Sequence, residues 1–136
     1  MRVPMVQQIF VNLPVHDLPR AKAFFAALGF AFNPQFTNDS GACLVLGDNI
    51  FAMLLTREFF ATFIDRPVAD TRAQAAVIVC VAVESRERVD DLFARALAAG
   101  ATPGRPPQDH GFMYQHGFED LDGHLWELVH LSGAPS

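Results

Sequence analysis

The sequence predicts an α+β fold built from two tandem βαβββ modules, and three observations support this prediction. Apolar runs of strand length alternate with turn residues, and two of these runs are each followed by an amphipathic helix pattern. The order of one strand, one helix and three strands occurs twice. Landmarks recur at similar spacing: Val15 and Val83 lie 68 residues apart, whereas Gly29 and Gly100 lie 71 residues apart. Because one such unit alone would leave a sheet face bare, pairing two units is physically sensible.

The first module is expected over residues 5–64. A strand over residues 6–15 leads into a helix that begins at Asp17, whose side chain can cap the first turn. Pro19 lies early in this helix, where its missing N–H has no cost. The pattern then predicts three strands and a short helix, over residues 30–36, 41–46, 50–56 and 57–64.

The second module is expected over residues 73–132, so that the two modules make one domain over residues 1–136. A continuous apolar strand over residues 75–83 precedes a helix that begins at Ser85 and ends near Gly100. The segment 104–107 is expected to be irregular. Two closing strands follow, over residues 112–118 and 125–131, and they are joined by a turn at residues 121–124.

Composition excludes several classes of protein. Hydrophobic residues make up 51% of the chain and charged residues 18%, which is typical of a folded globular domain. The net charge of −5 argues against a nucleic-acid partner, and no apolar stretch approaches the ~20 residues of a membrane span. Residues 1–8 lack the pattern of a secretory signal, and Cys43 and Cys80 are read as free buried thiols. We therefore expect a cytoplasmic protein.

Two segments carry a resemblance to a known family. Residues 11–30 (VNLPVHDLPRAKAFFAALGF) contain a Val-x-Asp-Leu motif before a helix that ends in Leu-Gly-Phe. Residues 117–127 (GFEDLDGHLWE) form a closing motif, in which Leu121 stands where the family pattern has proline. Together these motifs resemble the vicinal-oxygen-chelate superfamily of glyoxalases, bleomycin-resistance proteins and extradiol dioxygenases. The resemblance implies a cup-shaped mixed β-sheet with the helices on its outer face.

The resemblance also implies where a metal site would lie. The family takes one ligand from each of four strands, and these positions fall at Phe10, Met53, Ile78 or Val79, and Glu127. Of these side chains, Glu127 alone offers a donor atom that a divalent ion accepts. We therefore expect no cofactor and no usual metal site, although an improvised divalent-metal site that includes Glu127 and His116 stays open.

A hairpin closed at residues 121–124 would place Glu127 opposite Phe118, and Val129 opposite His116. Side chains that lie opposite each other share a face, and alternate residues along a strand keep that face. Tyr114 and His116 are therefore expected to face the cup with Glu127, with Trp126 on the other face as part of the core.

The same alternation predicts the remaining candidate ligand-binding residues. They are Phe10, Asn12, Met53 and Cys80 on the strands, and His110 in a glycine-flanked loop that could cover the mouth of the cup. An apolar cup with a few polar groups is typical of a site for a small molecule.

Three functions remain open at this point. The first is the binding of a small, partly hydrophobic molecule without chemistry, similar to bleomycin-resistance members that sequester a drug. The second is a metal-dependent lyase, isomerase or dioxygenase. The third is a metal-free enzyme that uses Glu127 or His116 as its acid or base. Because 13 phenylalanines exceed what one small core buries, and the family commonly pairs modules, we also expect a homodimer.

Overall fold

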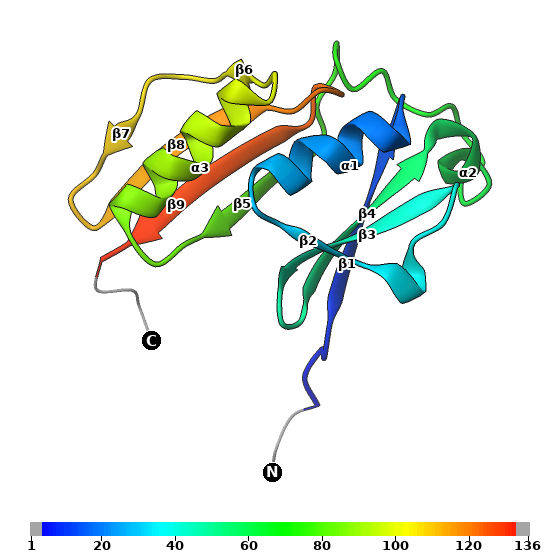
Figure 1. Ribbon diagram of the computed structural model, residues 1–136, viewed down its shortest axis with the longest axis horizontal. Coiled ribbons are helices and arrows are strands. Elements are labelled where there is room, and N and C mark those ends of the chain that lie inside the picture. The colour runs from blue at the N-terminus through cyan, green and yellow to red at the C-terminus, as the bar shows by residue number, and fades with distance from the viewer. Residues whose placement is uncertain (1–3, 133–136) are drawn as a thin grey trace. The chain divides into compact units, whose positions relative to one another are not determined.

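The structure, a computed structural model, describes residues 4–132 of the chain. The chain forms two compact units, Met1–Val68 and Ala69–Ser136, and each is described by itself below. The helices and strands of both units are labelled in Figure 1.

The N-terminal module follows the order strand, helix and three strands. Its elements are β1 (Ile9–Val15), α1 (Leu18–Ala27), β2 (Ala31–Asn33), the short 3-10 helix η1 (Pro34–Phe36), β3 (Gly41–Gly47), β4 (Ile50–Thr56) and α2 (Arg57–Ala61). The strands form a mixed sheet in the order β1-β4-β3-β2, in which β1 runs parallel to β4 and the other neighbours are antiparallel.

Helix α1 covers one face of this sheet. The side chain of Asp17 accepts a hydrogen bond from the backbone N–H of Arg20 at 3.0 Å, which satisfies one free donor of the first turn. The apolar side of α1 supplies Phe24 and Phe25 to the core, and the sheet supplies residues such as Leu54, all 2% exposed or less. Burial of this face is the main contribution to the stability of the module.

The C-terminal module repeats the plan with an extra short strand. Its elements are β5 (Ile78–Ala82), α3 (Arg86–Ala98), β6 (Thr102–Pro103), β7 (Gln108–Asp109), β8 (Met113–Glu119) and β9 (Leu125–Leu131). The sheet order is β5-β9-β8-β6, with β7 also paired to β8. Strand β5 runs parallel to β9, and the other pairs are antiparallel.

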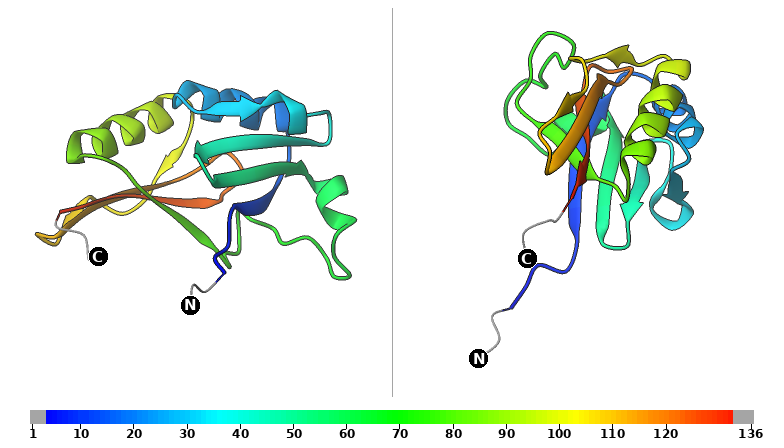
Figure 2. Two further views of the ribbon diagram at one scale, coloured as in Figure 1. Left: turned by 90° about the horizontal axis from the view of Figure 1, so that it is seen from below. Right: turned by 90° about the vertical axis from the view of Figure 1, so that its left-hand side faces the viewer.

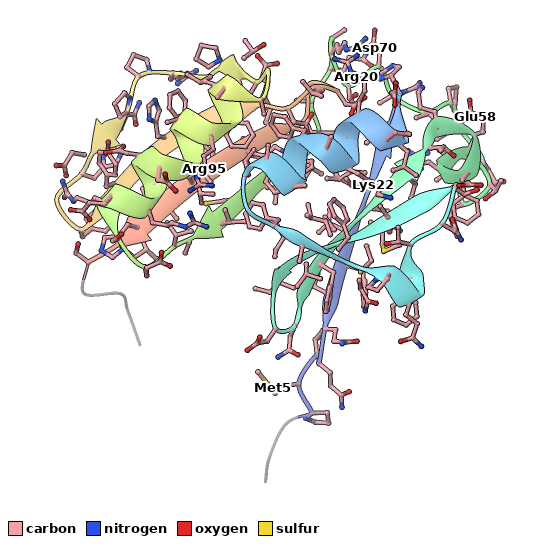
Figure 3. All side chains as sticks on the ribbon, in the orientation of Figure 1. Met5, Arg20, Lys22, Glu58, Asp70 and Arg95 are labelled. Atoms are coloured by element: carbon pink, nitrogen blue, oxygen red, sulfur yellow. The ribbon has the colours of Figure 1, made fainter. Side chains whose placement is uncertain are left out.

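Helix α3 lies along one face of the C-terminal sheet and packs on β8 and β9 (Figures 1 and 2). The Ser85 side chain caps it by accepting a hydrogen bond from the backbone N–H of Arg88 at 3.0 Å. Val89 and Leu92 are buried on its inner side. Arg95, on α3 in Figure 3, pairs instead with Asp91 at 3.0 Å on the solvent side. The opposite face of the sheet is therefore free of this helix.

The predicted α+β class and the two βαβββ modules are confirmed, with local differences. The strand predicted over residues 30–36 ends at Asn33, because the Asn33 side chain accepts a hydrogen bond from the N–H of Gln35 at 2.9 Å and a 3-10 helix begins at Pro34. The strand predicted over residues 75–83 is shorter, and the segment 104–107, predicted to be irregular, is flanked by β6 and β7, which the sequence pattern did not predict. Within residues 4–132, no helix is long and apolar enough to cross a membrane.

Candidate binding site

The closing hairpin β8–β9 has a different register from the one predicted. Glu127 lies opposite Gly117, and His116 lies opposite Leu128. The predicted pairs, Glu127 with Phe118 and Val129 with His116, are therefore wrong by one residue. A shift of one residue moves every side chain of one strand to the other face relative to its partner.

The length of the turn explains this shift. The N–H of Asp120 donates to the carbonyl oxygen of His124 at 3.0 Å, and the N–H of Gly123 donates to the carbonyl oxygen of Asp120 at 3.1 Å. Gly123 has a φ of +83°, which is the left-handed conformation that ends a three-residue hairpin loop. The loop is therefore Leu121–Gly123, with three residues, where the prediction assumed four.

The buried carboxylate of Asp120 holds this turn together. It accepts hydrogen bonds from the backbone N–H groups of Asp122 at 2.9 Å and His124 at 3.0 Å, and from the indole Nε1 of Trp126 at 3.0 Å. Burial raises the pKa of the Asp120 carboxyl, although the charge of His124 and the hydrogen bonds act in the opposite direction. These bonds give Asp120 a structural role.

His116 and Tyr114 lie on the helix face of the sheet, so the prediction that they share a face with Glu127 is wrong. The ring of His116 stacks on Phe93 of α3, with 3.5 Å between the ring centroids. The hydroxyl of Tyr114 donates to the Asp90 carboxylate at 2.6 Å. Both side chains are thus engaged by α3.

The environment of His116 is unusual in one respect. Its Nδ1 atom is buried and has no hydrogen-bond partner among the described residues. Burial lowers the pKa of His116, whereas the charges of Asp90 and Glu127 raise it. The side chains of His116 and Glu127 project from opposite faces of the sheet. This arrangement therefore does not support a joint acid–base role for them at one site.

Glu127 projects from the face of the C-terminal sheet that is turned away from α3, which we call the open face. Its neighbour on the parallel strand β5 is Cys80, a free thiol that is exposed, so the prediction of a buried thiol is wrong at this position. Partial desolvation and the charge of Glu127 raise the pKa of this thiol. Its neighbour on β8 is Gly117. A Cβ added to Gly117 would lie 3.0 Å from Oε2 of Glu127, so the missing side chain leaves room for this carboxylate.

A cavity of about 410 Å³ lies against the C-terminal sheet, and Glu127 is one of its lining residues. Two carboxylates line it, those of Glu127 and Glu119, together with the guanidinium-bearing Arg105. The other lining residues are Ile78, Gly104, Pro106, Gln108, Gln115, His116, Gly117, Phe118, Leu125 and Trp126. The volume is in the range of sites that hold small molecules.

Sequence reasoning missed the polar residues Arg105, Gln108, Gln115 and Glu119. Gln115 and Glu119 lie two residues either side of Gly117, so with the correct register the alternation would have placed both beside Glu127. The Nε2 of Gln115 donates to Oε1 of Gln108 at 3.1 Å, which ties β8 to β7. No local pattern indicated that β7 would pair at this edge.

The remaining predicted residues do not belong to the closing hairpin. In the N-terminal module, Asn12 pairs with Met53, and Phe10 stacks on Phe51 with 4.8 Å between ring centroids, all on the sheet face away from α1. Phe10 is 46% exposed. His110 is exposed, and it is not among the residues that line the cavity.

The donor set does not fit the metal site that the superfamily resemblance implies. The corresponding positions hold Phe10, Met53, Ile78 or Val79, and Glu127, and hydrocarbon and thioether side chains are poor ligands for Zn²⁺ or Mn²⁺. Across residues 4–132, no group of three His, Cys, Asp or Glu side chains could hold an ion.

We therefore expect the purified protein to contain well under one equivalent of Zn, Ni, Mn or Fe. Elemental analysis of protein prepared without chelator tests this expectation. A content near one equivalent that is lost in the Glu127→Ala variant would contradict it.

Comparison with known proteins agrees with this fold. Residues 7–47 match the family described as bleomycin resistance protein-like N-terminal. No curated protein matches the sequence. Among solved structures, a hypothetical protein from S. aureus is similar at 27% identity with a TM-score of 0.77, over 93% of this chain and 95% of the other.

Two further solved structures carry informative names. One is a glyoxalase/bleomycin resistance protein/dioxygenase family enzyme from Burkholderia phytofirmans, at 20% identity and a TM-score of 0.74, over 90% of this chain and 96% of that chain. The other is the bleomycin resistance determinant of transposon Tn5, at 18% identity and a TM-score of 0.65, over 95% and 100%. The chain has the fold of the vicinal-oxygen-chelate superfamily, so the resemblance of its motifs is confirmed. The family-model match lies in the first module, over residues 7–47.

Proposed function

We propose that this protein binds a small, partly hydrophobic molecule in the cavity of its C-terminal module, with Glu127 as the polar anchor. The observation that carries the proposal is the cavity itself, about 410 Å³ in volume, with the Glu127 carboxylate in its lining. The bleomycin-resistance-like match of the first module agrees with a binding protein.

The lining combines the two properties that a ligand site needs. Ile78, Leu125 and Pro106 offer apolar surface, which contributes affinity in proportion to the area that a ligand covers. Glu127 and Gln115 offer a few polar groups, which fix the orientation of the ligand. A cavity of this composition suits a molecule with an apolar body and at least one hydrogen-bond donor.

Replacing Glu127 by Gln tests the anchor, because it removes the charge at nearly constant shape. We expect a loss of roughly tenfold or more in affinity for ligands found by saturation-transfer NMR screening, equivalent to about 1.4 kcal/mol. The free energy of unfolding should change by less than about 1 kcal/mol, because the side chain is only half-buried and a lost surface charge has little effect on stability.

The matched control is Glu58→Gln, the same change at an exposed position in the first turn of α2 (Figure 3). This control variant should keep the full affinity. Equal loss in both variants, or no loss in Glu127→Gln, would contradict the assignment of Glu127 as the anchor.

We also propose that the protein forms a homodimer. Strand β1 is an edge strand of its sheet, and large apolar side chains on β1 and β4 are exposed, among them Ile9, Phe10 and Ile50. Exposed apolar edges of this kind are typically covered by another chain. Sedimentation equilibrium at micromolar concentration should give twice the mass of the chain, and a monomer mass would count against this proposal.

A further inference from the structure

We propose that the cavity of the C-terminal module selects ligands that carry a positive charge, such as an ammonium or guanidinium group on an apolar body. This inference rests on the proposed function and deepens it by naming the class of ligand. It follows from the charges that line the cavity and from the lack of partners for them within residues 4–132.

Two carboxylates line the cavity, and no basic side chain within residues 4–132 pairs with either of them. On the open face, Glu119 lies opposite Leu125, two residues along β9 from Glu127, which is the spacing of diagonal neighbours about 7–8 Å apart. Both side chains are half-buried, and neither makes a hydrogen bond or an ion pair with the part of the chain that the structure describes. Both carboxylates are therefore available to pair with a bound cation.

Among the described residues, the lining of the cavity supplies too little positive charge to neutralise this pair. Arg105 lines the cavity from the exposed segment between β6 and β7, and within residues 4–132 it forms no ion pair with either carboxylate. The other basic residue in the lining is His116, whose ring stacks on Phe93 on the helix face. The lining is thus left with two carboxylates against one exposed guanidinium.

The surrounding groups fit a cation that donates hydrogen bonds. Gly117 has no side chain, so the Glu127 carboxylate can lie over this strand position in the lining of the cavity. The amide of Gln115 donates through Nε2 to Gln108, which leaves its Oε1 as an acceptor that points to no partner in the described chain. Carboxylate and amide oxygens are acceptors, whereas an ammonium group has only donors, so the two sets are complementary.

The apolar part of such a ligand also has a place. Ile78 is 57% exposed although it belongs to the cavity lining, and Leu125 beside it on β9 is half-buried. Covering these side chains would contribute affinity that does not depend on charge. A cationic molecule with a hydrocarbon or aromatic body therefore matches the cavity better than a small inorganic cation.

Three probes of similar shape and different charge test this inference: 2-phenylethylamine, 2-phenylethanol and 3-phenylpropionate. Each is titrated into ¹⁵N-labelled full-length protein, and the backbone amide signals of Gly117 and Glu127 are followed. We expect the amine to bind about tenfold or more tightly than the alcohol and the carboxylate to bind most weakly. The advantage of the amine should fall as salt is raised, because the site is open to solvent.

Variants separate charge selection from binding itself. Glu127→Gln should lower the affinity for the amine much more than the affinity for the alcohol, and so remove most of the amine's advantage. A dispersed ¹⁵N spectrum like that of the parent protein shows independently that the variant is folded. Glu58→Gln, which makes the same change in net charge on α2, should leave the preference intact.

Two outcomes overturn the inference while leaving the proposed function in place. One is equal affinity for all three probes, which would show a site without charge preference. The other is tightest binding of 3-phenylpropionate, which would show that Arg105 governs the cavity. If no probe shifts the signals of Gly117 and Glu127, charge selection at this cavity is also overturned. The saturation-transfer NMR screen then tests the proposed function separately.

Discussion

Gly123→Ala is expected to destabilise the C-terminal module by about 3 kcal/mol or more, the larger part from steric overlap. The φ of +83° alone costs an L-residue of this kind roughly 1–2 kcal/mol. An added Cβ would also overlap the carbonyl oxygen of Thr71 and lie 2.7 Å from the Cα of Arg72. These are backbone atoms, so the overlap cannot be relieved by a change of rotamer.

The segment at residues 71–72 has little freedom to move aside. The hydroxyl of Thr71 donates to the carbonyl oxygen of Asp122 at 2.5 Å, and Arg72 donates through Nη2 to the carbonyl oxygen of Leu121 at 3.2 Å. Both bonds reach the same turn that contains Gly123. Moving the segment away would break them, and each is worth about 1 kcal/mol.

Gly111→Ala is the matched control for this prediction. Gly111 has nearly the same φ, +82°, but a Cβ at this position would meet no atom within 4 Å. Its variant should lose only the conformational part, about 1–2 kcal/mol. Urea unfolding followed by circular dichroism measures the stability of both variants. Equal losses of stability would show that residues 71–72 move aside at no cost in free energy.

The architecture could be predicted from the sequence because its signals are local. Asp17 and Ser85 cap their helices as the pattern indicated, and each cap depends on a hydrogen bond across three residues. Strand boundaries were less certain where a side chain competes with the sheet for a backbone group. Asn33 is an example, because its side-chain oxygen binds the N–H of Gln35 and ends β2 earlier than the apolar pattern suggests.

The candidate site could be predicted only in part because it depends on the register of one hairpin. The faces of Glu127 and Trp126 were assigned correctly, since adjacent residues of one strand always alternate. The partner strand was placed wrongly, since nothing local shows whether the turn has three residues or four. That choice is fixed by the buried Asp120 carboxylate, whose hydrogen bond to Trp126 joins residues of β9 to the turn.

Trp126→Ala is expected to cost about 3–5 kcal/mol, as for other large buried aromatic residues. The indole is 2% exposed and lies parallel to the ring of Phe118, with 6.4 Å between centroids. Its Nε1 also donates to the Asp120 carboxylate at 3.0 Å. The variant therefore leaves both a void beneath α3 and a buried carboxylate with one donor fewer.

Trp126→Phe separates the two contributions, because it keeps an aromatic ring and removes the donor. We expect this variant to lose about 1–3 kcal/mol, the cost of leaving a buried acceptor without its partner. Unfolding should be followed by circular dichroism, since Trp126 is the single tryptophan of the chain and cannot serve as a common fluorescent probe. Glu127→Gln, one residue further along β9, should stay within about 1 kcal/mol of the parent because its side chain projects from the open face. If Trp126→Ala proved mild and Glu127→Gln unfolded the module, the two faces of β9 would have to be exchanged, and the cavity would lose its proposed anchor.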